Sequence, residues 1–213
     1  MPTSRTIKRI FGAAGFFLLG GTTAAALSMT QPPAPKVAKA ATPAPTVSAN
    51  RIALDASGVR QALALGLIDR PVRSVLNVPA RMHYGDFLWD DKGVPAGQTW
   101  VRVDLKSQLI SVFRSGHEIG TAVILYGADS VPTPTGKFPV IAKLKDHRSA
   151  TYDAPMPYTL RLTADGVSIH ASDVRWGYAT HGCIGVPVEF AAKLFEAMRV
   201  GDEVFVVDSA SNA

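Results

Sequence analysis

Acidic residues are missing from the first fifty positions of the chain, which hold five basic residues and no Asp or Glu. The remaining residues balance 17 of the 22 basic side chains against all 17 acidic ones, so the formal charge of +5 comes from the first fifty positions. An excess of positive charge that is confined in this way does not indicate a nucleic-acid-binding face. We therefore expect no nucleic-acid partner.

Cysteine is also scarce, and Cys183 is the single thiol. One cysteine excludes an internal disulfide and any zinc site built on several thiolates. The other candidate ligands, His83, His117 and His147, lack the spacing of a metal site, so we predict no metal and no cofactor. A catalytic role is the commonest reason to keep a single accessible thiol, and the alternative is an inert, buried one.

Three basic residues precede an apolar stretch from Ile10 to Leu19, and small residues follow as far as Ala26. This order predicts a secretion signal in residues 1–30, with cleavage after Ala26. Residues 10–27 are also nearly long enough to remain as an inner-membrane anchor, which needs roughly 20 apolar residues. Both readings lead to a protein that is periplasmic, secreted or anchored to the inner membrane.

Five prolines alternate with Ala, Lys and Thr in residues 31–50, a composition that cannot build a packed core and predicts a linker. Residues 51–97 form an N-terminal extension to which we assign no chemistry. A helix is expected there around Ser57 to Leu67. Residues 98–208 then carry the patterns of one folded domain.

Alternating apolar residues predict a series of β-strands in that domain. The expected strands are residues 101–105 and 109–113, which form a hairpin, followed by 119–126, 138–142, 159–162, 167–171 and 204–207. The residues around His147 are expected to form a solvated loop. A helix is predicted to begin at Pro187 and to end before Gly201. The chain is therefore predicted to be mainly β, a sandwich or barrel with one or two packed helices.

The residues with the most chemical content lie near Cys183. A free thiol has a pKa of about 8.5 and needs a nearby base or positive charge to react at neutral pH. His170 can be that base, because strand alternation places it on the face opposite the apolar Ile169. Gly182 allows close backbone approach, so the amides of Gly182 and Cys183 could form an oxyanion hole.

This region closely resembles the L,D-transpeptidase catalytic domain, the YkuD-like family, whose hallmark is a histidine followed later by Ser/Thr-His-Gly-Cys. Here the hallmark is His170 and then Thr180 to Cys183. Residues 103–109 resemble the opening hairpin of the family, and residues 132–138 resemble its Thr-Pro-Thr-Gly loop. The resemblance covers roughly residues 98–208 in the order of the family.

The resemblance implies that Cys183 is the nucleophile and His170 the general base, with the Ala171 carbonyl orienting the imidazole. His181 and Gly182 would line the oxyanion side, although His181 could instead only support the loop, and Thr180 would hold the cysteine loop through its hydroxyl. Aromatic side chains that could border the cleft or simply pack are Tyr126, Tyr158 and Trp176.

Two features depart from the family pattern. Many members have an arginine two positions after the cysteine, whereas this chain has Gly185. Arg175 and Arg161 are the candidates to hold a substrate carboxylate in its place. The interval between His170 and Thr180 is also short, which predicts a smaller loop over the site. Both departures concern substrate preference rather than chemistry.

The implied activity is acyl transfer on peptidoglycan stem peptides through a cysteine thioester, in cell wall cross-linking or remodelling. If water is the acceptor, the same residues make an L,D-carboxypeptidase or cross-link hydrolase. A non-catalytic peptidoglycan-binding module is the alternative from another class. A papain-like peptidase is disfavoured because its cysteine precedes its histidine, the reverse of the order of His170 and Cys183.

Overall fold

The computed structural model describes residues 50–209. The predicted signal segment and all but the last residue of the predicted linker lie outside the described residues. Within residues 50–209, no helix is both long and apolar enough to cross a membrane.

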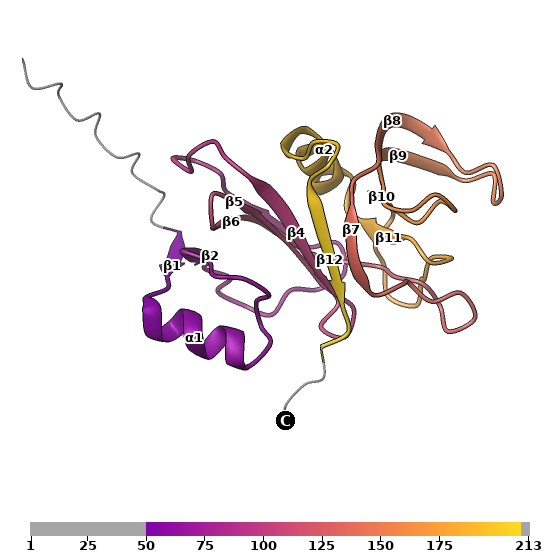
Figure 1. Ribbon diagram of the computed structural model, residues 1–213. Helices are drawn as coiled ribbons and strands as arrows, with labels where there is room; N and C mark the ends of the chain where they lie inside the picture. The colour runs from indigo at the N-terminus through magenta and orange to yellow at the C-terminus, as the bar shows by residue number, and fades with distance from the viewer. Residues whose placement is uncertain (1–49, 210–213) are drawn as a thin grey trace, which may run out of the picture. The chain divides into compact units, whose positions relative to one another are not determined.

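Twelve strands and two helices follow one another along this part of the chain (Figure 1). In order they are β1 (Arg51–Ala53), α1 (Ala56–Ala64), β2 (Ser74–Leu76), β3 (Phe87–Trp89), β4 (Thr99–Asp104), β5 (Leu109–Arg114), β6 (His117–Val123), β7 (Gly136–Pro139), β8 (Ala142–Arg148), β9 (Pro155–Arg161), β10 (Ser168–Ala171), β11 (Ile184–Val186), α2 (Val188–Ala197) and β12 (Glu203–Val207). The prediction of a mainly β protein is confirmed.

The strands form two open sheets. The larger has the order β1-β2-β6-β5-β4-β12-β7, with β3 added to β6, and the smaller has the order β11-β10-β9-β8. Neither order returns to its first strand, so the strands do not close into a barrel. Strands β1, β2 and β3 belong to the N-terminal extension, which therefore contributes to the larger sheet.

Helix α2 packs against strands of both sheets, contacting β9 and β10 of one and β6 of the other. Its buried face carries Phe190 and Leu194, and Met198 directly after it is also buried. This is the spacing of a helix with one apolar stripe. Burying each such side chain contributes about 1.5–3 kcal/mol, so α2 anchors the smaller sheet, and with it the site described below, to the larger one.

The predicted hairpin is the pair β4–β5, in which Val101 lies opposite Val112 and Val103 opposite Ile110. These four side chains are completely buried. The predicted strands 159–162 and 167–171 correspond to β9 and β10, and the predicted C-terminal strand corresponds to β12. Regular apolar alternation was therefore a sound guide to the central strands.

The prediction of a solvated loop around His147 is wrong, because this residue lies in β8 and pairs with Met156 of β9. Strand β8 is the edge of the smaller sheet, and most of its side chains are exposed. Charged residues are common on such edges because they discourage pairing with another chain, but they also erase the apolar alternation that marks a strand. The short strand β11 was missed for a different reason: three residues carry no measurable period.

Candidate active site

Cys183 lies directly before β11, which pairs in parallel with β10. Ile184 is opposite Ile169, and Gly185 is opposite His170. Cys183 therefore lies beside the residue before Ile169, which is Ser168. This pairing brings the two residues of the family hallmark to neighbouring strands, although they are 13 positions apart in the sequence.

The loop before Cys183 is held by two threonine hydroxyls that converge on one carbonyl oxygen. Thr180 Oγ1 donates to the Cys183 carbonyl at 2.5 Å, which is the loop contact that the resemblance implies. Thr133 Oγ1 lies 3.4 Å from the same oxygen and accepts a hydrogen bond from the Gly127 amide. Gly182 has a φ of 93°, a left-handed conformation that a residue with a Cβ adopts only with strain.

Thr133 belongs to the Thr-Pro-Thr-Gly loop, for which the sequence suggested no specific role. Its hydroxyl explains why that loop and the cysteine motif occur together, because one directly supports the other. Two isolated bridges reinforce the connection, between Leu125 and Gly185 and between Gly127 and Thr180. The chain that follows β6 thus flanks the cysteine segment on the side away from β10.

The His170 imidazole is 8% exposed, and its Nδ1 donates to the Ala171 carbonyl at 2.8 Å. This contact places the ring proton on Nδ1 and leaves Nε2 as the free acceptor. Burial lowers the pKa of His170, the Ala171 hydrogen bond opposes this shift, and the nearby His147 adds to it. His170 is thus a neutral imidazole at neutral pH, which is the form a general base requires.

The Cys183 side chain is partly buried, and its Sγ lies 3.9 Å from the Gly166 carbonyl. Burial raises the pKa of this thiol, while the Ser168 amide and the Arg161 guanidinium lower it and Asp165 raises it further. Among the described residues, the hydrogen-bond contacts of Sγ are with the backbone of Gly166 and Ser168, and not with His170. The resting pair is therefore a neutral thiol and a neutral imidazole, and catalytic contacts of this kind commonly tighten only when substrate binds.

The other predicted site residues are distributed around this pair. The exposed His181 ring stacks on Tyr152, with centroids 4.2 Å apart, which joins the cysteine loop to the turn between β8 and β9. Tyr126 and Tyr158 pack against the main hydrophobic core, and Tyr158 meets Phe195 edge-on. Their role at the substrate cleft stays a prediction.

The connection from β10 to β11 carries the remaining candidates. Trp176 is 81% exposed and meets Tyr84 of the N-terminal extension edge-on, with centroids 5.6 Å apart. Arg175 is exposed and forms an ion pair with Asp173 at 2.7 Å. The Arg175 guanidinium is therefore already paired with a carboxylate in this structure.

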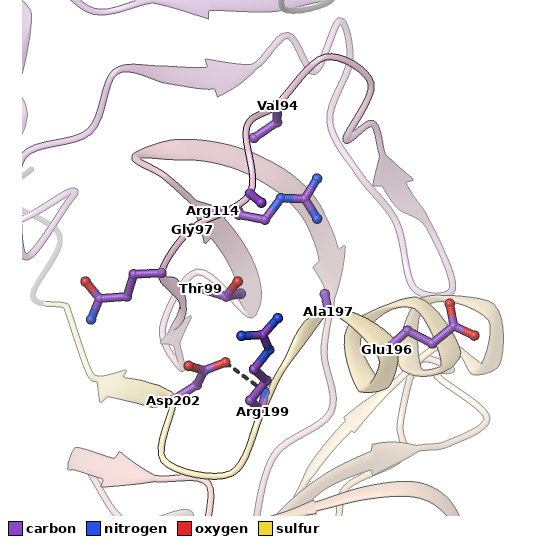
Figure 2. A pocket seen from close by; sticks show the side chains of 10 residues that line it. Val94, Gly97, Thr99, Arg114, Glu196, Ala197, Arg199 and Asp202 are labelled. Carbon is purple, nitrogen blue, oxygen red and sulfur yellow. Dashed lines mark hydrogen bonds between the residues drawn. The ribbon is translucent and has the colours of Figure 1, made fainter. Parts of the chain in front are cut away.

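A separate pocket of about 480 Å³ lies where α2 ends (Figure 2). Its lining includes Thr99, Arg114, Glu196, Arg199 and Asp202. None of the predicted site residues lines it, and the ten residues of α2, about 15 Å of helix, separate it from the cysteine segment. This pocket is therefore separate from the candidate site around Cys183. Residues 50–209 also contain no group of three or more His, Cys, Asp or Glu side chains that could hold a metal ion.

Comparison with known proteins finds the family that the sequence motifs resemble. The family model of the YkuD L,D-transpeptidase catalytic domain matches residues 98–206, slightly more than half of the chain. L,D-transpeptidase 1 of Mycobacterium tuberculosis is 31% identical over 136 residues, which cover 54% of this chain and 53% of the relative. The chain thus spans about half the length of the curated relatives it matches.

A solved structure of the same family shares the fold. The L,D-transpeptidase of Stackebrandtia nassauensis aligns with a TM-score of 0.50 and 24% identity, over 56% of this chain and 60% of that one. An Enterococcus faecium L,D-transpeptidase mutant aligns with a TM-score of 0.48 and 28% identity, over 53% and 50%. With the family model matched over its catalytic region, this chain belongs to the L,D-transpeptidase catalytic domain family.

Proposed function

We propose that this protein is a peptidoglycan L,D-transpeptidase that works through a thioester on Cys183, outside the cytoplasmic membrane. The observation that carries the proposal is the pairing of β10 with β11, which sets the cysteine segment beside a histidine whose Nδ1 is tied to a backbone carbonyl. A binding module would have no need for an imidazole that is held with its proton on Nδ1, on the strand beside the cysteine segment. The export signal expected in residues 1–30 is the basis for the location.

In the first half-reaction, His170 Nε2 takes the Sγ proton and the thiolate attacks the carbonyl at the L-centre of diaminopimelate in a tetrapeptide stem. The carbon–nitrogen bond breaks, the imidazolium returns its proton to the departing D-alanine amine, and a thioester remains on Cys183. The energy of the peptide bond is conserved in the thioester, so no nucleotide is consumed.

In the second half-reaction, an acceptor amine loses a proton to His170 and attacks the thioester carbonyl, which releases the thiol. The amine of another stem gives a cross-link, and water gives hydrolysis. Each tetrahedral intermediate carries a negative oxygen, for which the amides of Gly182 and Cys183 are the available donors. Losing one such donor typically slows an enzyme by about 10²- to 10³-fold.

Intact-mass spectrometry of the purified protein, after incubation with a disaccharide tetrapeptide, tests the proposal. We expect an adduct equal to the donor minus D-alanine on the native protein and none on Cys183→Ala. His170→Gln should retain the fold and form the adduct about 10²- to 10⁴-fold more slowly, the usual range for a general base. An adduct that persists in Cys183→Ala would refute the mechanism.

The products then distinguish the acceptors. Release of dimers linked between two diaminopimelate residues identifies a transpeptidase, and release of free tripeptide alone identifies a hydrolase. A folded protein that binds stems without any turnover, and whose Cys183 resists iodoacetamide, would instead be a binding module.

A further inference from the structure

Gly185 occupies the position at which many family members carry an arginine, and the structure leaves no room for a side chain there. A Cβ at this position would lie 2.7 Å from Ser172 Oγ, 2.8 Å from Ser172 Cβ and 3.4 Å from Leu125 Cβ. The backbone cannot easily yield, because Gly185 is paired with His170 on one side and Leu125 on the other. Any cation in this site must therefore come from another strand.

Strand β9 supplies one at the matching position. Arg161 is opposite Ser168 in the β9–β10 pair, and Cys183 lies beside Ser168 on its other side. Residues opposite each other in a sheet direct their side chains to the same face. Two strand spacings amount to about 10 Å, a distance that an arginine side chain can largely cover. The Arg161 charge acts on the thiol, because it lowers the pKa of Cys183 against the effect of burial.

Among the four described arginines with a buried Nε, Arg161 is the one whose guanidinium has no hydrogen-bond or ion-pair partner. Its Nε is buried without a hydrogen bond, and within residues 50–209 none of its nitrogens forms an ion pair. Three other arginines have a buried Nε, but Arg51, Arg102 and Arg114 each use their remaining nitrogens in hydrogen bonds. A partly buried cation without a counter-charge is costly, which is reasonable where an anion arrives during function.

Resting on the proposed function, we infer that Arg161 is the substrate-binding residue that holds the carboxylate of the donor's terminal D-alanine, in place of a cation at position 185. That carboxylate is one residue beyond the bond that Cys183 attacks, so a cation that shares the sheet face of Cys183 two strands away can reach it. Arginine binds carboxylates through two parallel hydrogen bonds, which also orients the leaving residue. The site would thus select donors with a free C-terminal carboxylate.

The test compares two donors, the tetrapeptide acid and its C-terminal carboxamide, in the acylation of Cys183 measured as kcat/KM. We expect the native protein to prefer the acid by about 10- to 100-fold, the usual discrimination from one charge-assisted contact. Arg161→Gln should lose that preference, because it slows acylation by the acid about 10- to 100-fold more than acylation by the carboxamide. Arg161→Lys, which retains the charge, should keep part of the preference. Arg175→Gln tests the competing candidate: it should retain the native preference for the acid, and loss of the preference in this variant instead would overturn the assignment.

Equal losses with both donors in Arg161→Gln, together with an upward shift in the pH profile of iodoacetamide alkylation, would overturn the assignment and make Arg161 a stabiliser of the thiolate. If Arg161→Gln does not fold, Arg161→Lys decides: full loss of discrimination with a native melting curve would contradict carboxylate binding by charge. Failure of the native protein to react with either donor would remove the proposed function itself and this inference with it.

Discussion

The crowding at Gly185 predicts a loss of stability that can be measured in a Gly185→Ala variant. Gly185→Ala places a methyl group 2.7–2.8 Å from two atoms of Ser172, closer than carbon and oxygen atoms normally approach. Overpacking of this kind typically costs about 1–3 kcal/mol. For a protein of this size, that corresponds to a fall in melting temperature of about 2–4 °C per kcal/mol.

The partner substitution makes the prediction specific. Ser172→Gly removes both of the close atoms and leaves only the 3.4 Å contact to Leu125, an approach that a small shift relieves. The double variant should therefore lose less stability than the two single variants added together, with a coupling of about 1–2 kcal/mol. Ser172→Gly alone bears its own cost, from backbone entropy and from the Oγ that lies 3.4 Å from His170 Nδ1.

Urea unfolding of the native protein, the two single variants and the double variant measures the coupling directly. Additive losses would show that Ser172 is not the obstacle, and a Gly185→Ala variant as stable as the native protein would show that the strands yield easily. Either result would refute the argument that this site excludes a side chain from position 185. It would also reopen position 185 to the arginine found in many relatives.

Three further predictions follow from the packing and the charges of the site. Thr133→Val should raise the activation free energy of Cys183 acylation by more than it lowers the free energy of unfolding, because the lost hydroxyl supports the cysteine loop. Single-turnover rates and urea unfolding measure the two free energies, and equal changes in both would contradict the prediction. The pKa of folded His170 lies below its ordinary value, so the unfolded chain binds more protons than the folded one below about pH 6.5. The free energy of unfolding should therefore fall as the pH decreases from about 6.5 through the pKa of folded His170. Urea titrations of His170→Gln should lack this pH-dependent component. Leu194→Ala should cost about 2–5 kcal/mol in urea unfolding because Leu194 is buried where α2 meets the smaller sheet, and a loss below 1 kcal/mol would mean that the helix repacks freely.

Local patterns in the sequence determined much of this protein. Apolar alternation marked the β4–β5 hairpin and the strands β9, β10 and β12, and the i, i+4, i+8 spacing marked α2. The catalytic candidates Cys183 and His170 were also evident, since a hallmark motif depends on residue types and order. These features can be predicted from the sequence because each depends on residues within a short window of the chain.

Only the tertiary structure decided which residues meet across long separations. The choice between Arg161 and Arg175 depended on strand register and on which guanidinium already formed an ion pair with a carboxylate. Neither property can be predicted from the residues adjacent in sequence. Thr133 reaches the Cys183 carbonyl from 50 positions away. The charged edge strand β8 forms because β9 offers it a partner, not because its own residues favour a strand. Hydrogen-bond partners and free space are properties of the assembled sheets, so the motif could name the candidate site residues but not the neighbours that constrain them.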